Sequence, residues 1–315
     1  MADDLLTLAD LAIVNNKNDA DYDISDLLDK APVIRALAAD TASNGTVHSY
    51  IKETGAPVVG FRAVNVGRDL DSSVDTQVSI NLQILDATHG VDQALADAYR
   101  RGAAAYVGRE SERHLRAAYF KAEQQMFYGI VETGGDAAGF TGINDTLDNY
   151  GLTQVIAANA VATVSNRTSV YFIRTGENDA QVIAGNDGLI QVGETVTQKF
   201  ISSGTLSFPA YYTPIHTWLG FQMGSVWSVV RLCNIPDAGG NLLDDDLIYD
   251  ALEIFPVGSM PNYVVMNRRS REQLRKSRTA TNQTGTPAPT PVEVAGIPII
   301  TTDAITNAEA DVPAS

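Results

Sequence analysis

The sequence has a single cysteine, Cys233, so no disulfide can form within one chain, and nothing indicates an oxidising compartment. It has no apolar run near the roughly 20 residues that a membrane-spanning helix requires. Its first residues, MADDLLTLAD, have neither the basic nor the apolar region of a secretory signal. We therefore expect a soluble protein that is made and used in a reducing cytoplasm.

Positive charge is also scarce. The chain has 22 lysines and arginines against 38 aspartates and glutamates, which gives a net charge of −16. A chain this acidic repels nucleic acid and anionic membranes as a whole, so we expect no membrane partner. Its 315 residues, 44% of them hydrophobic, are enough for one large or two ordinary domains with a sizeable core.

The motifs of common catalytic sites are missing. No Gly-x-Ser-x-Gly elbow occurs, and the glycine-rich stretch at 134–142 lacks the Gly-Lys-Ser/Thr of a phosphate-binding loop. Cys233 lies in the strand-like run VVRLCNI, which favours a buried inert thiol over a nucleophile. The histidines lie far apart and lack the spacing of a zinc site: His48, His89, His114 and His216. We therefore expect no enzyme, no cofactor and no metal ion.

Three consecutive aspartates, Asp244, Asp245 and Asp246, are the remaining candidates for chemistry. Clustered carboxylates could hold a divalent cation, or act in a β-rich hydrolase or sugar-binding protein. They stand, however, at the start of the amphipathic run DDDLIYDALEIF, where a helix N-terminus favours negative charge. No spaced partner ligand follows them, so the pattern favours a capping role.

The N-terminal region is rich in aspartate. Residues 1–30 hold eight aspartates against two lysines, and their apolar residues come in short clusters. This composition predicts an arm that needs another surface to order it. Ser25 can cap a helical turn, and Pro32 suits the first turn of a second helix, PVIRALAAD, which ends before the turn-forming SNG at 43–45.

Residues 50–86 read as two long extended runs around a polar turn, with no third strand beside them. The second run alternates, which places Val78, Ile80, Leu82 and Ile84 on one face. An isolated hairpin is marginal in water because it buries too little to offset chain entropy. Strands of about 11 to 15 residues would reach about 35 to 50 Å. The ribbon must therefore lie on something else.

Residues 92–131 favour one helix of about 40 residues, because the stretch is rich in good helix formers and has no proline. Its apolar stripe is interrupted at 109–114, so the two ends are expected to pack against different partners. Gly102 and Gly108 weigh against continuity or mark a close approach of the backbone. The glycine-rich stretch at 134–145 then stops the helix.

The remainder of the chain is rich in strands. We expect strands at 169–174, 179–185, 189–193 and 195–201, and within the long run 211–232. Two amphipathic helices, DDDLIYDALEIF and RRSREQLRKSR, then flank a buried strand at 262–267. A proline-bearing loop at 279–291 precedes the closing strand IPIITTDAI.

A basic stretch stands out in this acidic chain. Residues 268–278 include Arg268, Arg269, Arg271, Arg275, Lys276 and Arg278. These cations could contact phosphate. They could also form a solvated helix face that pairs with acidic patches on a neighbouring copy, and we favour this second interpretation. The same two interpretations, contact with phosphate or pairing with a neighbouring copy, apply to the arginines of the long helix, among them Arg100, Arg109 and Arg113.

Taken in order, these elements resemble the major capsid proteins of tailed bacteriophages, with the Hong Kong 97-type fold. The resemblance covers nearly the whole chain. It is carried by PVVGFRAVNVGR, by SVYFIRTGENDAQVIAGNDGLIQVGE with WSVVRLCNI, and by PNYVVMNRRSREQLRKS with VEVAGIPIITTDAI. It implies an α+β fold with an N-terminal arm and short helices (1–45), an extended loop (46–86), a peripheral domain (87–144) and an axial domain (145–291). The peripheral domain would hold the spine helix at 92–131, and residues 292–315 would complete it by returning to that helix. The division of 150–235 between the two domains stays open.

The resemblance also implies a function: self-assembly into hexamers and pentamers of an icosahedral head around double-stranded DNA, bound without sequence specificity. An acidic lining would keep the genome from adhering. Portal, scaffolding and decoration proteins are the expected partners, and the virion, assembled in the host bacterial cytoplasm, is the expected location. The subunit contacts would come from three sets of residues: Val59, Phe61, Arg62, Val64, Arg68 and Asp69 in the extended loop; Arg100, Arg109 and Arg113 in the spine helix; and Arg268, Arg269 and Arg271 in the basic helix. An encapsulin-like nanocompartment shell is the alternative with the same fold, and the hydrolase reading is the alternative of another class.

Overall fold

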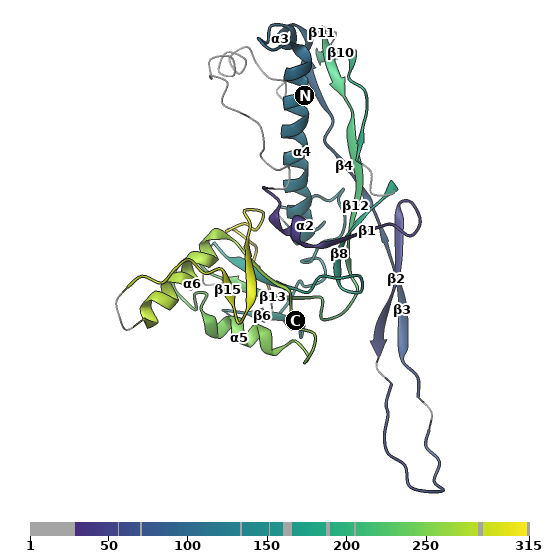
Figure 1. The fold of residues 1–315 in the computed structure, drawn as a ribbon, viewed down its shortest axis with the longest axis vertical. Coiled ribbons are helices and arrows are strands. Elements are labelled where there is room, and N and C mark those ends of the chain that lie inside the picture. The colour runs from purple at the N-terminus through teal and green to yellow at the C-terminus, as the bar shows by residue number, and fades with distance from the viewer. Residues whose placement is uncertain are drawn as a thin grey trace.

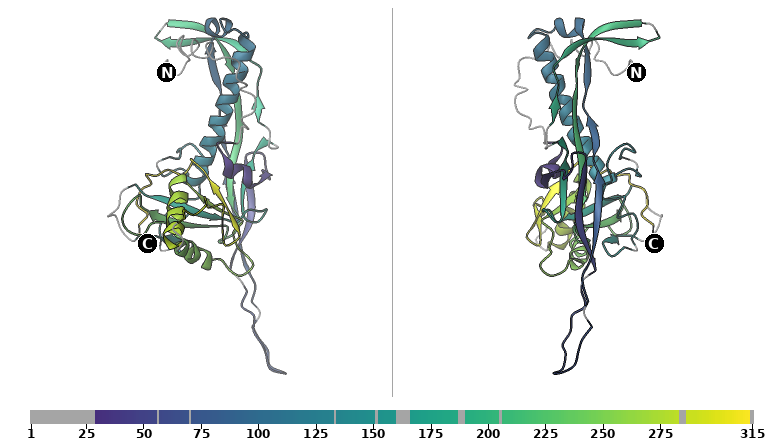
Figure 2. Two further views of the ribbon diagram at one scale, coloured as in Figure 1. Left: turned by 60° about the vertical axis from the view of Figure 1, so that its left-hand side comes forward. Right: turned by 90° about the vertical axis from the view of Figure 1, so that its right-hand side faces the viewer.

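The computed structural model of the chain describes residues 29–55, 57–69, 71–132, 134–150, 152–159, 166–186, 190–204, 206–282 and 286–313. They form an elongated molecule in which a globular body lies below an upright stem, and two ribbons leave the stem (Figure 1; Figure 2). The predicted arm, with Ser25, lies almost entirely outside the described residues.

The body is built on one sheet with the strand order β15-β16-β14-β7-β13-β6. These strands are β6 (Val155–Ala157), β7 (Thr168–Ile173), β13 (Val229–Ile235), β14 (Tyr263–Met266), β15 (Glu293–Val294) and β16 (Ile297–Thr301). Every residue of β7 and β13 is buried, as expected for strands that are covered on both faces. The sheet is therefore the centre of the body.

Helices α5 (Asp245–Glu253) and α6 (Arg268–Thr281) cover one face of this sheet, where Phe172 and Leu232 pack with Ile248 and Leu274. The lower end of α4 (Ala103–Tyr128) and the C-terminal segment cover the other face. The predicted helix, strand, helix and closing strand are thus confirmed. The closing strand β16 pairs in parallel with β14, so it belongs to the body sheet, and the residues after it make the return to α4.

The stem consists of α4 and a sheet beside it (Figure 1). This sheet has the order β1-β8-β12-β4, with β9 on β12. Its strands are β1 (Ala38–Thr41), β4 (Gln83–Asp86), β8 (Ala180–Ala184), β9 (Gln191–Val192) and β12 (Ile215–Met223). At the top, β5 (His89–Asp92), β10 (Val196–Ser203) and β11 (Leu206–Thr213) form a second sheet, in which Phe200 packs against the backbone of Gly90.

The prediction of one continuous helix over 92–131 is wrong. A short helix α3 (Gln93–Asp97) precedes α4, and the break between them ends at Gly102, the N-cap of α4. Gly102 has a φ of 90°, a conformation that side chains with a Cβ rarely adopt and that a helix cannot contain. Gly108 lies inside α4 without a close neighbour. The helix stops at Gly129, so the predicted stop before the glycine-rich turn is confirmed.

The predicted helix over 32–40 is also shorter than expected. Helix α2 spans only Pro32–Ala36, and the chain is already extended at Leu37. The following residues pair in parallel with β8 as strand β1, and the Ala38 N–H donates to the Thr175 hydroxyl at 2.8 Å. Strand pairing with a distant segment has thus overridden the local helical preference of an alanine-rich sequence.

The predicted ribbon is present. Strands β2 (Val47–Gly55) and β3 (Val74–Asn81) pair antiparallel and lead to a loop that extends beyond the body (Figure 1). The predicted apolar face ends at Leu82, which is 2% exposed, whereas Ile84 is 55% exposed. The reason is that the strand leaves the ribbon at Leu82 and continues as β4, where Ile84 pairs with Trp218 of β12.

A buried ion pair joins the body to the stem. Arg231 of β13 lies 3.3 Å from the carboxylate of Glu309, and both side chains are shielded from water. The Arg231 guanidinium also donates to the Leu147 carbonyl at 2.8 Å, and Tyr128 at the end of α4 donates to Glu309 at 2.9 Å. A strand, the C-terminal segment and the stem helix therefore meet at one fully bonded polar centre.

We predict that Arg231→Met lowers the free energy of unfolding of the subunit by about 3 to 5 kcal/mol, because it leaves the Glu309 carboxylate buried without its cation. Urea denaturation measures this loss. The double variant Arg231→Met/Glu309→Gln should recover part of it. As a matched control, Arg268→Met breaks the exposed pair with Asp303 and should cost less than about 1 kcal/mol. Equal losses for the buried and the exposed pair would contradict the prediction.

Candidate functional site

The end of the β2–β3 ribbon carries apolar side chains with no core to enter. Val59 is 81% exposed, Phe61 is fully exposed and Val64 is 86% exposed. The other predicted contact residues of this loop, Arg62, Arg68 and Asp69, are exposed as well. Exposing several apolar side chains on one projection to water is unfavourable for a monomer. This ribbon tip (residues 57–69) therefore has the character of an interaction site.

Polar contacts across the base of the loop hold the ribbon tip. The Val58 N–H donates to Asp71 at 2.7 Å, and Arg68 donates to the Val58 carbonyl. Arg62 donates to the Val66 carbonyl at 3.4 Å. Two of the predicted contact arginines therefore bind backbone carbonyls of the loop itself, and the apolar side chains are left as its exposed groups.

The three spine-helix arginines occupy different places. Arg100 is exposed in the break between α3 and α4. Arg109 packs inside its own chain: its guanidinium lies 5.4 Å from the ring centre of Tyr99 and 4.9 Å from that of Tyr106. Arg109 thus fastens the top of α4 to the residues before it, and its guanidinium is engaged within its own chain.

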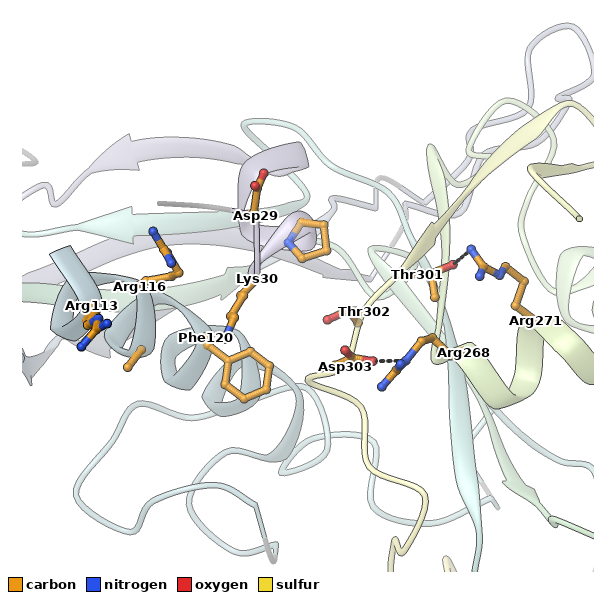
Figure 3. A pocket seen from close by; sticks show the side chains of 12 residues that line it. Asp29, Lys30, Arg113, Arg116, Phe120, Arg268, Arg271, Thr301, Thr302 and Asp303 are labelled. Carbon is orange, nitrogen blue, oxygen red and sulfur yellow. Dashed lines mark hydrogen bonds and ion pairs between the residues drawn. The ribbon is translucent and has the colours of Figure 1, made fainter. Parts of the chain in front are cut away.

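Arg113 and Arg116 of α4 face Arg268 and Arg271 of α6 across a groove of about 740 Å³ (Figure 3). Asp29 and Lys30 form part of its wall, and Phe120 adds an apolar side. Figure 3 shows Arg113 and Arg116 on one side of this space and Arg268 and Arg271 on the other, with Arg268 directed to Asp303 and Arg271 to Thr301. The structure therefore brings one predicted spine-helix arginine together with two residues of the predicted basic helix. We call this space the basic groove.

Arg269, the third predicted residue of the basic helix, points elsewhere. Its guanidinium donates to the Ile235 carbonyl at 3.3 Å and to the Asn307 carbonyl at 3.4 Å. Desolvation by burial lowers the pKa of Arg269, which is partly enclosed by these loops. Within the body, Arg269 thus connects α6 to the end of β13 and to the C-terminal segment.

A buried glutamate anchors the chain next to the basic groove. Glu123 of α4 is fully buried and accepts hydrogen bonds from the N–H groups of Val33 at 2.8 Å and Ile34 at 3.2 Å. The Thr302 hydroxyl donates to its other oxygen. Burial raises the pKa of Glu123 to about 7, and the hydrogen bonds from Thr302, Ile34 and Val33 oppose this shift. One carboxyl group thus connects the stem to both ends of the described chain.

The other candidates for chemistry have structural roles. Asp244 caps α5 by accepting from the Leu247 N–H at 2.9 Å, and Asp245 pairs with Arg278 at 2.7 Å, so the predicted capping role is confirmed. Cys233 is buried, and burial raises the pKa of its thiol to about 12. Both findings agree with the predictions.

The prediction that the histidines lie far apart is wrong for one pair. The His89 and His114 rings stack with their centroids 4.9 Å apart, because β5 lies against α4. Within the described part of the chain, however, no group of three histidine, cysteine or acidic side chains could hold a metal ion. The two rings therefore form a stacked pair and not a metal site. Burial, and then the charge of His114, lower the pKa of His89.

Sequence reasoning missed three features. Arg231 interrupts the apolar strand VVRLCNI, and a lone charge in such a run is the available signal for a buried polar contact. Glu123 lies in the mixed run YFKAEQQMF, beside Lys121 and two glutamines, and no such signal marks it. The third is a second projecting ribbon, β10–β11, which leaves the top of the stem sideways (Figure 2). Near its end Ile201 is 64% and Leu206 67% exposed.

The fold is that of phage capsid subunits. The chain resembles a capsid chain of bacteriophage Epsilon15 with a TM-score of 0.69 at 19% identity, over 99% of this chain and 98% of that one. It also resembles the capsid of bacteriophage JBD30 with a TM-score of 0.55 at 10% identity, over 95% and 99% of the two chains. These likenesses establish the fold of the chain.

The family follows from the sequence itself. Residues 16–313 match the family model "Major capsid protein GP7", and the chain belongs to this family. The recognition of a phage major capsid protein is therefore confirmed, and with it a structural role in the virion and not an enzymatic one. No curated protein matched the chain. No helix among the described residues has the length and apolar character to cross a membrane.

We predict that the stability of the subunit falls as the pH rises from about 4.5 to about 7, the ordinary and the native pKa of Glu123. Below this window the group is protonated in the folded and the unfolded state; above it, the folded state must bury a charge. Glu123→Gln should remove this part of the slope, about 3 kcal/mol. Urea denaturation at pH 5 and pH 7.5 measures it.

The variant itself supplies the control for other titrating groups, since they are the same in both proteins. Relative to the native chain, Glu123→Gln should be more stable at pH 7.5 than at pH 5. A difference between the two proteins that does not change with pH would show that Glu123 titrates as it does in the unfolded chain.

Proposed function

We propose that this chain forms the icosahedral head of a tailed phage as a Hong Kong 97-type subunit, assembled into hexamers and pentamers around double-stranded DNA. The observation that carries the proposal is the ribbon tip, with Val59, Phe61 and Val64 exposed on a projection that extends beyond the rest of the chain. Full burial of one such side chain contributes about 1.5 to 3 kcal/mol. Covering this tip against a neighbour would supply several such contributions to each subunit contact.

The β10–β11 ribbon supports the same proposal from the opposite end of the molecule. Its exposed Ile201 and Leu206 lie near the tip, away from the body (Figure 2). A subunit with apolar projections at both ends can contact more than one neighbour, which a closed shell requires and a simple dimer does not. The two ribbons therefore favour an extended array of identical subunits.

The domains of the proposed fold follow the two parts of the molecule. We assign the body sheet with α5 and α6 to the axial domain, and α4 with the stem sheets to the peripheral domain. On this assignment the open region 150–235 is divided strand by strand: β6, β7 and β13 are axial, whereas β8 to β12 are peripheral. The ribbon over 46–86 remains the extended loop.

The charge of the chain fits a container for DNA. A net charge of −16 disfavours adhesion of the packaged genome, because a protein binds DNA mainly by neutralising phosphates and releasing their counterions. DNA contacts would then be non-specific. Assembly would take place in the cytoplasm of the bacterial host, with portal, scaffolding and decoration proteins as partners.

Phe61→Asp and Val64→Asp test the role of the ribbon tip. Each should leave the subunit folded, since neither side chain packs in a core, but should lower the association constant of each subunit contact at least about tenfold, which corresponds to 1.4 kcal/mol, and so lower the assembled fraction. Light scattering and electron microscopy measure the assembled fraction, and circular dichroism the fold. Closed shells tens of nanometres across are expected from the native chain.

Val257→Asp is the matched control, because Val257 is fully exposed on the body and not on a ribbon. It should assemble like the native chain. Normal assembly of Phe61→Asp and Val64→Asp would refute the role of the ribbon tip. Native particles that contain no DNA in infected cells would favour a nanocompartment shell instead.

A further inference from the structure

The basic groove concentrates positive charge on an acidic protein. Five cationic side chains line it, Lys30, Arg113, Arg116, Arg268 and Arg271, against two carboxylates, Asp29 and Asp303. Three of its four arginines have a carboxylate partner: Arg268 pairs with Asp303 at 2.6 Å, Arg113 with Glu110 at 2.9 Å and Arg116 with Glu112 at 2.7 Å.

Arg271 is different, because it makes no ion pair with any residue that the structure describes. Its Nη1 donates to the Thr301 hydroxyl at 3.3 Å, and its buried Nε has no hydrogen-bond partner there. Leaving a buried cationic donor without an anion is unfavourable. The groove is therefore suited to a ligand that carries carboxylates or other anionic groups.

The chain itself enters the groove. Asp29 and Lys30 form part of the wall, and Glu123 fixes the next residues by accepting from the N–H groups of Val33 and Ile34. The preceding sequence, NDADYDISD at 18–26, is acidic. If extended, it would place Asp19, Asp21 and Asp23 on one face and alternate them with Ala20, Tyr22 and Ile24 on the other. Such a strand matches a groove with arginines and an apolar side at Phe120.

Reach favours the arm of the same chain. Asp23 precedes Asp29 by six residues, about 20 Å of extended chain at ~3.3 Å per residue. A segment tethered so closely to its site has an effective concentration in the millimolar range, which the arm of a separate subunit does not have in dilute solution. Charge complementarity and tethering thus point to one occupant.

We propose that the basic groove binds residues 19–26 of its own chain, with the carboxylates of Asp19, Asp21 and Asp23 on the groove arginines. The groove supplies the surface that the acidic arm requires. This contact forms within one subunit and does not depend on shell assembly. It would set the direction in which the arm leaves the stem before any neighbour is present.

Amide hydrogen exchange of the full-length subunit, followed over residues 19–26, tests the contact. Arg268→Glu/Arg271→Glu should speed exchange of these amides by about threefold to tenfold, the range expected from exposed ion pairs. Adding Asp21→Arg/Asp23→Arg to the same chain should restore slow exchange by reversing both partners. Raising the salt concentration should act like the first variant, because these pairs are screened.

Lys276→Glu is the matched control, since Lys276 lies on the same helix, is exposed and does not line the groove. It should leave arm exchange unchanged. Asp21→Arg/Asp23→Arg alone serves as a second disrupting variant, which alters no residue of the groove and keeps the test valid should the arginine variant fail to fold. Arm exchange that none of these changes affects would overturn the proposal.

A thiol crosslink separates the arm of the same chain from that of a neighbour. Asp21→Cys with Thr301→Cys, treated with a short bifunctional thiol reagent, should give a crosslink within one chain. The native Cys233 is buried and should not react. Crosslinked dimers would overturn the proposal in favour of a neighbour's arm. Loss of duplex DNA binding in Arg268→Glu/Arg271→Glu, with arm exchange unaffected, would show instead that the groove holds phosphate.

Discussion

The buried pair of Arg231 and Glu309 is the contact on which the shape of this subunit depends. It joins β13 of the body to the C-terminal segment, and Tyr128 adds the end of α4 through its hydrogen bond to Glu309. Two buried charges are tolerated only where hydrogen bonds satisfy them, and such centres have strict geometric requirements. A purely apolar junction would allow the body and the stem to slide; this one specifies one arrangement.

A rigid junction matters because the outer parts of the molecule are long. The ribbon tip and the β10–β11 ribbon lie far from the core, so a small rotation at the junction would move either tip by a large distance. Apolar contacts between subunits have little directional preference of their own. In the proposed assembly, the buried polar centre would therefore supply directional information, and the exposed Phe61 and its neighbours would supply affinity.

The sequence predicted most elements of the fold because their local signals agreed with their environment. The strands β7 and β13, the helices α5 and α6, and the ribbon followed from apolar runs, amphipathic periodicity and alternation. It failed where a distant partner decided the outcome. Residues 38–41 became a strand because β8 lies beside them, and the spine helix broke at Gly102, whose φ no helix pattern reveals.

The sequence also predicted the candidate interaction surfaces only in part. Exposure of the ribbon tip could be inferred, since an isolated ribbon has no core. The roles of the arginines could not, because charge alone does not say whether a guanidinium stacks on a tyrosine, as Arg109 does, or faces a groove, as Arg271 does. Nor could the pairing of His89 with His114, which requires β5 to lie against α4. Such contacts depend on tertiary structure, and sequence spacing carries little information about them.

Glu123 contacts residues near both ends of the described chain. Its carboxyl group binds the backbone of Val33 and Ile34 through one oxygen and Thr302 through the other, from within the stem helix. A change in its ionisation therefore acts at once on the root of the arm, on the C-terminal segment and on α4. Because the basic groove opens beside the same residues, the charge of Glu123 also contributes to the electrostatic potential that an acidic arm would experience there. If the arm binds the groove as proposed, the protonation of Glu123 and the binding of the arm would therefore be coupled within a single subunit.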